Sequence, residues 1–166
     1  MLIRKLTEDD LEAVWMLRLQ ALKDNPEAFG STYQEAFTRG KAWMLQRLQG
    51  KEDQTFYLGA FDEAIFGMVA LYREEGIKNW HKGYVVSMYV HPEKRGVGAG
   101  KALMQELIAR AKQLEGLEQL LLAVVTTNQT AYQLYRSLGF EVYGTEPKAL
   151  KMDGEYWDEH LMVLRL

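Results

Sequence analysis

Tyr84–Gly100, with the sequence YVVSMYVHPEKRGVGAG, is the stretch that decides the fold of this chain. Its first seven residues are mostly apolar and predict a buried strand. Glycine then recurs at positions 96, 98 and 100. Apolar residues at helical spacing follow, at Leu103, Met104, Leu107, Ile108, Ala111 and Leu114. The sequence therefore predicts a strand, a glycine-rich turn and a helix in direct succession.

A turn of this kind at the start of a helix favours binding of an anion. Glycine has no Cβ, so backbone N–H groups can approach a ligand closely. The helix N-terminus adds unpaired N–H groups and a partial positive charge, which together suit a phosphate or pyrophosphate. Arg95 adds a full positive charge at the rim of this turn.

The spacing of the glycines argues against two common nucleotide-binding motifs. A Walker A loop needs a Ser or Thr after its Gly-Lys pair, but Gly100-Lys101 is followed by Ala102. A dinucleotide fingerprint needs G-x-G-x-x-G. Its last glycine would fall on Lys101 or on Leu103. Neither motif is matched.

Two blocks of the sequence resemble the GNAT N-acetyltransferase superfamily. The first matches the acetyl-coenzyme A motif V-x-P-x-x-R-x-x-G-x-G/A at Val90, Pro92, Arg95, Gly98 and Gly100. The second, residues 128–140 (NQTAYQLYRSLGF), is similar to the family element N-x-x-A-x-x-L-Y-x-x-x-G-F. The two blocks are about 30 residues apart, in the family's order and with a strand between them.

This resemblance implies an α/β fold of the GNAT type, a mixed central sheet flanked by helices, in one N-acetyltransferase domain over residues 1–166. It implies acetyl-coenzyme A as cosubstrate. Tyr135 occupies the position of the family's general acid. The implied cofactor-binding residues are Met88, Val90, Arg95, Gly96, Val97, Gly98, Ala99, Gly100, Lys101, Asn128 and Tyr135.

Some of these positions have structural explanations as well. An aromatic residue on an apolar helix face, such as Tyr135, usually packs in a core. Asn128 is a good helix N-cap, and a contact with the pantetheine arm does not exclude that role. Met88 and Val90 would serve through the backbone of their strand, which an extended ligand can pair with as an extra strand.

The acceptor side is less defined by the sequence. By analogy with the family, the candidates for contact with the acceptor are Phe29, Tyr33, Glu35 and Glu74. Phe29 and Tyr33 could equally cover the core, and most surface glutamates are merely solvated. The segment Tyr156–Glu159 could close the acceptor site from the other side, where its acids would favour a cationic acceptor, but a polar turn explains them equally. The pattern does not identify a general base. The three histidines, at 81, 91 and 160, are too scattered to suggest a metal site.

Composition narrows the class of function. The chain has 166 residues, is 48% hydrophobic and carries a net charge of −3, which gives no reason to expect nucleic acid. The longest apolar run, residues 120–125, is far too short for a membrane span. The absence of cysteine excludes a thioester-forming acyl-enzyme, so transfer should be direct. It also fits a reducing, cytoplasmic location.

We therefore expect acetyl transfer from acetyl-coenzyme A to a primary amine of a small molecule or peptide, within a ternary complex. A preference for a longer acyl group and a non-catalytic acetyl-coenzyme A sensor are the alternatives. A homodimer is compatible with the sequence. The apolar patterns predict helices over about 7–24, 38–49, 99–115 and 128–138, and strands over 1–6, 56–61, 64–72, 84–90, 120–125, 140–145 and 160–166.

Overall fold

The computed structural model describes all 166 residues. Seven strands form one mixed sheet in the order β1-β2-β3-β4-β5-β7-β6. The strands are β1 (Leu2–Lys5), β2 (Thr55–Phe61), β3 (Ile65–Arg73), β4 (Lys82–Val90), β5 (Gln119–Val125), β6 (Glu141–Met152) and β7 (Glu155–Arg165). The helices are α1 (Leu11–Asp24), α2 (Tyr33–Arg39), α3 (Lys41–Leu48), α4 (Ala99–Ala111) and α5 (Gln129–Ser137). Short 3-10 helices span Glu8–Asp10, Pro26–Ala28 and Pro92–Lys94.

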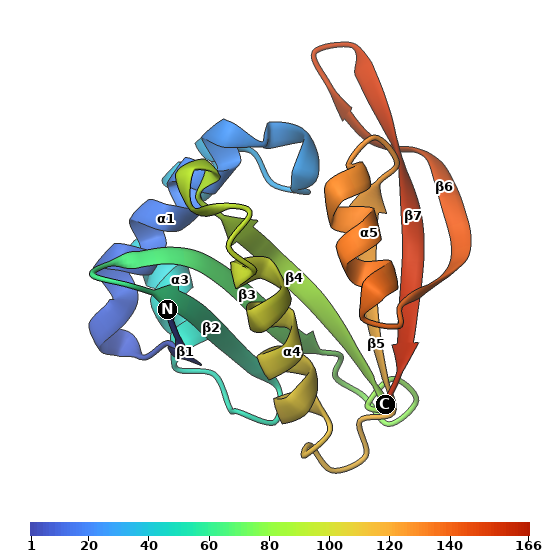
Figure 1. Ribbon diagram of the computed structural model, residues 1–166, viewed down its shortest axis with the longest axis horizontal. Helices are drawn as coiled ribbons and strands as arrows, with labels where there is room; N and C mark the ends of the chain where they lie inside the picture. Colours follow the sequence, from blue (N-terminus) through green and yellow to red (C-terminus); the bar gives the residue numbers. More distant parts are fainter.

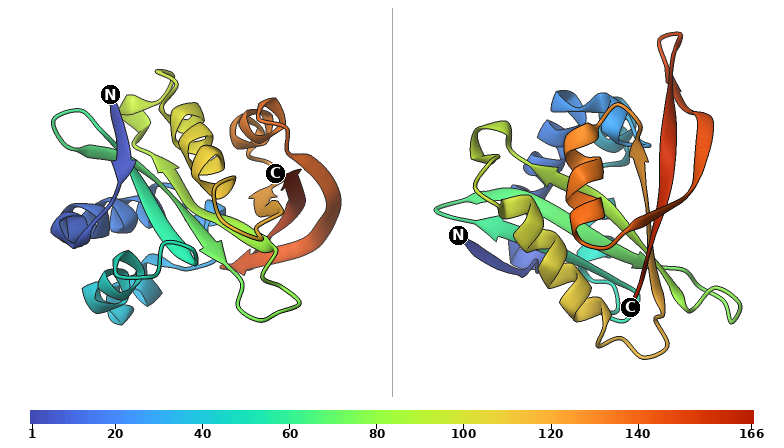
Figure 2. Two further views of the ribbon diagram at one scale, coloured as in Figure 1. Left: turned by 90° about the horizontal axis from the view of Figure 1, so that it is seen from below. Right: turned by 45° about the vertical axis from the view of Figure 1, so that its right-hand side comes forward.

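Helices cover both faces of the sheet, as the GNAT-type α/β prediction requires. The N-terminal helices α1 to α3 lie on one face, and α4 and α5 lie on the other (Figures 1 and 2). Each face has its own buried cluster: Val14, Leu22 and Met44 belong to the first, and Leu103, Leu107 and Phe140 to the second. Burial of these apolar surfaces is the main force that holds the layers together.

The sheet opens in its middle, between β4 and β5. These two parallel strands pair only from Lys82 to Tyr84 on β4, with Gln119 to Leu121 on β5, and then diverge (Figure 1). A bulge in β4 accompanies the divergence, because Ser87 and Met88 together stand opposite Val69 of β3. Ser87 has a φ of 57°. Bulges bend a strand and redirect its side chains, so β4 presents an unpaired edge toward β5.

The predicted helix over 38–49 is wrong in its limits. The structure has two helices there, α2 and α3, separated at Gly40. The start of α2 is fixed by Thr32, whose Oγ1 accepts from the N–H of Glu35 (3.1 Å), while the Glu35 carboxylate accepts from the N–H of Thr32 (2.8 Å). This reciprocal capping box is a helix start signal that the apolar pattern alone does not show.

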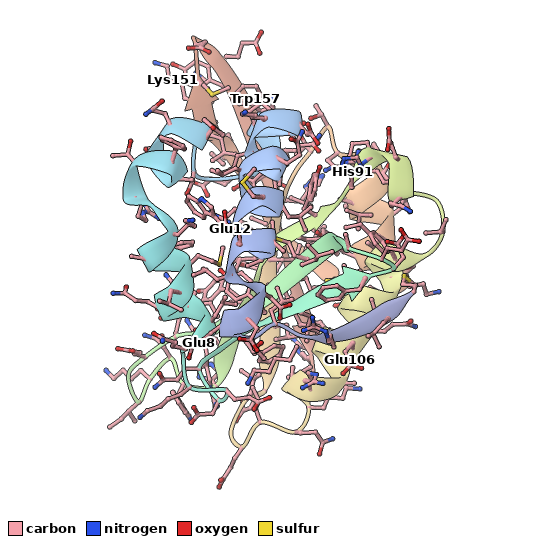
Figure 3. All side chains as sticks on the ribbon, turned by 90° about the vertical axis from the view of Figure 1, so that its left-hand side faces the viewer. Glu8, Glu12, His91, Glu106, Lys151 and Trp157 are labelled. Carbon is pink, nitrogen blue, oxygen red and sulfur yellow. The ribbon has the colours of Figure 1, made fainter.

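The C-terminal strands are also longer than predicted. Instead of short strands over 140–145 and 160–166, β6 and β7 form a hairpin that turns at Asp153 and Gly154. Figure 3 shows Lys151 and Trp157 on the part of this hairpin that projects beyond the helices. Its outer half is largely exposed, and its apolar residues do not alternate regularly with polar ones, so it lacks the pattern from which strands are predicted. Helix α4 likewise ends at Ala111 rather than near residue 115.

Arg73 joins the end of β3 to three loops, although it is only 1% exposed. Its guanidinium donates to the carbonyl oxygens of Trp80 (2.6 Å), Glu115 (2.7 Å) and Asp53 (3.4 Å), and it lies 3.7 Å from the centre of the Trp80 ring. Arg73→Met leaves these carbonyls unpaired. We expect a loss of about 2–4 kcal/mol in the free energy of unfolding.

That loss corresponds to a melting temperature lower by roughly 5–15 °C, measured by calorimetry. Arg73→Lys keeps the positive charge but not the planar set of donors, so its melting temperature should lie between those of Arg73→Met and the wild type. If Arg73→Met melts within about one degree of the wild type, these contacts contribute nothing to stability.

Candidate active site

A cavity of about 870 Å³ occupies the opening between β4 and β5. Its walls come from both strands, from the glycine-rich turn, from α5, and from the segment after α1. The predicted cofactor residues that line it are Met88, Val90, Arg95, Gly96, Gly98, Ala99, Gly100, Lys101, Asn128 and Tyr135. Val97 is 66% exposed and lies outside it. The fold thus brings the two sequence blocks together around one space.

The glycine-rich turn offers a row of free donors to this cavity. Gly96 and Gly98 have φ values of 81° and 83°, which favour glycine, and a Cβ at either would meet no atom within 4 Å. The N–H of Ala102 bonds to the carbonyl of Gly98 at 3.0 Å. The backbone N–H groups from Gly96 to Lys101 make no hydrogen bond within the protein. Free N–H groups at a helix N-terminus form an anion site.

Gly100 has a different role from Gly96 and Gly98. A Cβ on Gly100 would lie 3.2 Å from Cε of Met88 and 3.4 Å from Cδ2 of Leu134. The missing side chain therefore lets α4 pack closely against β4 and α5. The sequence motif predicts that all three glycines contact a ligand, but the structure shows that Gly100 also allows close helix packing.

Arg95 fixes the turn to the rest of the site. Its Nε donates to the carbonyl oxygen of Val90 (2.9 Å), and its Nη2 donates to Oδ1 of Asn25 (2.9 Å). Nearby, the Tyr89 hydroxyl donates to the carboxylate of Asp24. Burial and this hydrogen bond raise the pKa of Tyr89. These contacts hold the end of α1 against the end of β4.

Tyr135 is 6% exposed and lies against Phe140, with ring centroids 6.0 Å apart. Its ring belongs to the buried cluster beneath α4 and α5, which confirms a packing role. Its hydroxyl makes no hydrogen bond within the protein, and the residue lines the cavity. Burial raises the pKa of Tyr135 to about 12. The phenol is therefore protonated at neutral pH and is free to donate to a ligand.

Asn128 caps α5, because its side-chain oxygen accepts from the N–H of Ala131 (3.1 Å). The predicted N-cap is thus confirmed. Asn128 also lines the cavity, and its contact with a cofactor stays a prediction.

Glu159 is the residue of the segment Tyr156–Glu159 that lines the cavity. It lies on β7 opposite Val125 of β5, is half-buried, and lines the cavity. Burial raises the pKa of its carboxyl, and the facing Glu146 carboxylate on β6 raises it further. A carboxylate with a raised pKa is suited to accept a proton. No local motif marks Glu159, because only the hairpin brings it to the cavity.

Of the four predicted acceptor residues, only Phe29 lines the cavity. Glu35 belongs to the capping box of α2, and Tyr33 stacks on Phe37 with ring centroids 5.9 Å apart. Glu74 lies near Tyr84, whose pKa is raised first by burial and then by Glu74. Tyr84 lines the cavity whereas Glu74 does not.

Other kinds of site are not seen. Nowhere in the chain do three or more His, Asp or Glu side chains gather as a metal site would require. None of the helices combines the length and the apolar character needed to span a bilayer.

The chain was compared with known protein families and proteins. It matches the acetyltransferase (GNAT) family over residues 20–140. It is 32% identical over 124 residues to an N-alpha-acetyltransferase of Sulfurisphaera tokodaii, covering 69% of this chain and 71% of that protein. The chain therefore belongs to the GNAT acetyltransferase family, and the family prediction is confirmed.

Other similarities are shorter or more distant. The chain is 38% identical over 80 residues to an L-methionine sulfoximine/L-methionine sulfone acetyltransferase of Pseudomonas aeruginosa, and this match spans 48% of the chain and 46% of that relative. The chain thus aligns with about half the length of that protein. A Salmonella typhimurium protein solved with acetyl-coenzyme A has the same fold, with a TM-score of 0.85, 22% identity, and coverage of 100% and 94%.

Proposed function

We propose that this chain is an N-acetyltransferase that moves an acetyl group directly from acetyl-coenzyme A to a primary amine. Family membership supports this proposal. The observation that carries it is the shared cavity, in which the unpaired N–H groups of the glycine turn and the free hydroxyl of Tyr135 line the same space.

The cavity residues fit acetyl-coenzyme A. The N–H groups from Gly96 to Lys101 would hold its pyrophosphate, since they are free and precede the first bonded N–H of α4. The edge of β4 that has no partner beyond Tyr84 would pair with the extended pantetheine arm. Asn128 lies where that arm would pass along the N-terminus of α5. When bound, acetyl-coenzyme A supplies an activated acyl group as a thioester.

The side chains of the cavity divide the proton transfers between them. An amine with a pKa of about 10.4 is protonated at pH 7, which opposes attack by roughly 4–5 kcal/mol. Glu159 would accept the proton that the amine must lose, and the raised pKa of its carboxyl favours this role. Tyr135 would donate its phenolic proton to the departing thiol sulfur. The absence of cysteine is consistent with direct transfer.

The function is tested by an acceptor screen that follows thiol release from acetyl-coenzyme A with amino acids, polyamines, aminoglycosides and peptides. Release that depends on one class of amine is expected. A parallel arm with propionyl- and succinyl-coenzyme A separates acetyl transfer from transfer of a longer group. Tight binding of acetyl-coenzyme A without release by any amine would instead identify a sensor.

Gly98→Val should weaken acetyl-coenzyme A binding at least tenfold, or about 1.4 kcal/mol. The open space beside Gly98 would be filled by a branched side chain, and its φ of 83° is unfavourable for valine. Calorimetric titration measures the affinity. Gly154→Val is the matched control, because Gly154 has the same φ and equally open surroundings but lies outside the cavity. Equal affinities for both variants would place the pyrophosphate elsewhere.

A further inference from the structure

Arg18 is a charged residue inside the protein for which the proposed chemistry has no use. It lies on the inner face of α1 and is 7% exposed. Its Nη1 donates to Oγ of Ser87 at 3.1 Å, and this is its one hydrogen bond. Its Nε is buried without a partner. Burial lowers the pKa of the guanidinium, although arginine stays charged at neutral pH.

No carboxylate balances this charge. The Trp43 ring has three arginines around it, with Arg18 at 5.0 Å, Arg47 at 5.1 Å and Arg39 at 5.2 Å from its centre. None of the three takes part in an ion pair, although Asp and Glu outnumber Lys and Arg in the chain. Arg39 and Arg47 lower the pKa of Arg18 further. Buried arginines are normally paired, since an unpaired buried charge is costly.

Ser87 connects this charge to the cavity. It stands in the bulge of β4, with a φ of 57°, and it lines the cavity in the opening beside β5. Its Oγ accepts from Arg18 and donates to no protein group, so its hydroxyl proton is free. The bulge thus places the Ser87 hydroxyl at the cavity, with the Arg18 guanidinium directly behind it. An anion bound there would accept the free proton of Ser87, and the guanidinium behind Ser87 would favour its negative charge.

We propose that Ser87, with the charge of Arg18 directly behind it, binds the carboxylate of the acceptor, so that this protein acetylates free amino acids. The inference rests on the proposed acetyl transfer. Ser87 and Glu159 then line one cavity with both complements of an amino acid: the Ser87 hydroxyl, with Arg18 behind it, for the carboxylate, and Glu159 for the amine. The Pseudomonas relative, an L-methionine sulfoximine/L-methionine sulfone acetyltransferase, shows that such acceptors occur among similar proteins.

The test compares each proteinogenic L-amino acid with its primary amide, using thiol release at saturating acetyl-coenzyme A. The amide keeps the amine and side chain but has no negative charge. We expect kcat/KM for the best amino acid to exceed that for its amide by about 10- to 150-fold, as for one hydrogen bond between charged groups. Arg18→Met should lower kcat/KM for the acid far more than for the amide, so that the preference for the acid is lost.

Arg39→Met is the matched control, because Arg39 contacts the same Trp43 ring but is exposed. It should keep the preference for the acid. Stability gives a second readout. Arg18→Met removes a buried charge that has no carboxylate partner, so its melting temperature without acceptor should equal or exceed that of the wild type. A purely structural arginine would give a lower one.

Two results would overturn the proposal: amides or peptides that react as fast as free amino acids, or an Arg18→Met variant that loses acid and amide activity equally and melts earlier. If no amine releases thiol, the proposed transfer itself fails. Thermal shift then still tests the site, because the same amino acids, and not their amides, should raise the melting temperature of the wild type but not of Arg18→Met.

Discussion

Tyr135→Phe is expected to lower kcat and kcat/KM together by about 10²–10⁴, the usual loss when a general acid is removed. The substitution keeps the ring against Phe140 and removes a hydroxyl that makes no hydrogen bond to another protein group. Cofactor affinity and melting temperature should therefore change little, because the hydroxyl acts mainly in the transition state. A coenzyme A analogue with a more acidic thiol needs the acid less and should recover part of the rate.

Tyr132→Phe is the control for this experiment. Tyr132 lies one helical turn earlier on α5, outside the cavity, and contacts His160 with ring centroids 5.3 Å apart. It should turn over normally. If Tyr135→Phe also turns over normally but melts several degrees lower, then Tyr135 only packs, and water or another side chain protonates the thiol.

Glu159→Gln is expected to lower kcat/KM by about 10²–10⁴ at neutral pH, because the amine loses its proton acceptor. A base acts only when it is deprotonated, so in the wild type kcat/KM should rise with pH through the pKa of Glu159. Burial and Glu146 raise this pKa above the ordinary glutamate value. The inflection should therefore lie above that value, and it should be absent in Glu159→Gln.

Glu146→Gln separates this assignment from a structural effect. The Glu146 carboxylate faces Glu159 and raises its pKa, so removing the charge should lower that pKa. The acid limb of the pH profile should move to lower pH, while the plateau rate stays near that of the wild type. A limb that does not move in Glu146→Gln, or that persists in Glu159→Gln, would assign the inflection to another group.

The sequence was informative where function depends on a continuous segment. The glycine turn, the cap at Asn128 and the position of Tyr135 each belong to one short motif, and the fold brings all three to one cavity. Their local signals are strong because positive φ, capping and helix periodicity are properties of neighbouring residues. The order of strands and helices could be predicted for the same reason.

Residues that act through tertiary placement could not be predicted in the same way. Glu159 belongs to a segment that the sequence explains equally well as a polar turn, and it is the pairing of β7 with β5 that brings Glu159 to the cavity. Arg18 did leave a signal, since it stands four residues after Val14 and four before Leu22 on the buried face of α1. A charge at such a position is unusual. Glu35 shows the converse, because a local capping role explains a residue expected at the acceptor.

Because β4 and β5 pair over only a few residues, the stability of the folded chain should depend on whether its cosubstrate is bound. Beyond Tyr84 and Leu121 these strands have no direct pairing, so the unit of β5, α5, β6 and β7 has little backbone connection to the rest of the sheet. Units of this kind open locally at less free energy than the whole molecule. A ligand bridging the gap at 100 times its dissociation constant would add about 2.7 kcal/mol. Resistance to proteolysis should then follow the acetyl-coenzyme A supply, so that the protein survives longest when it has acetyl groups to transfer.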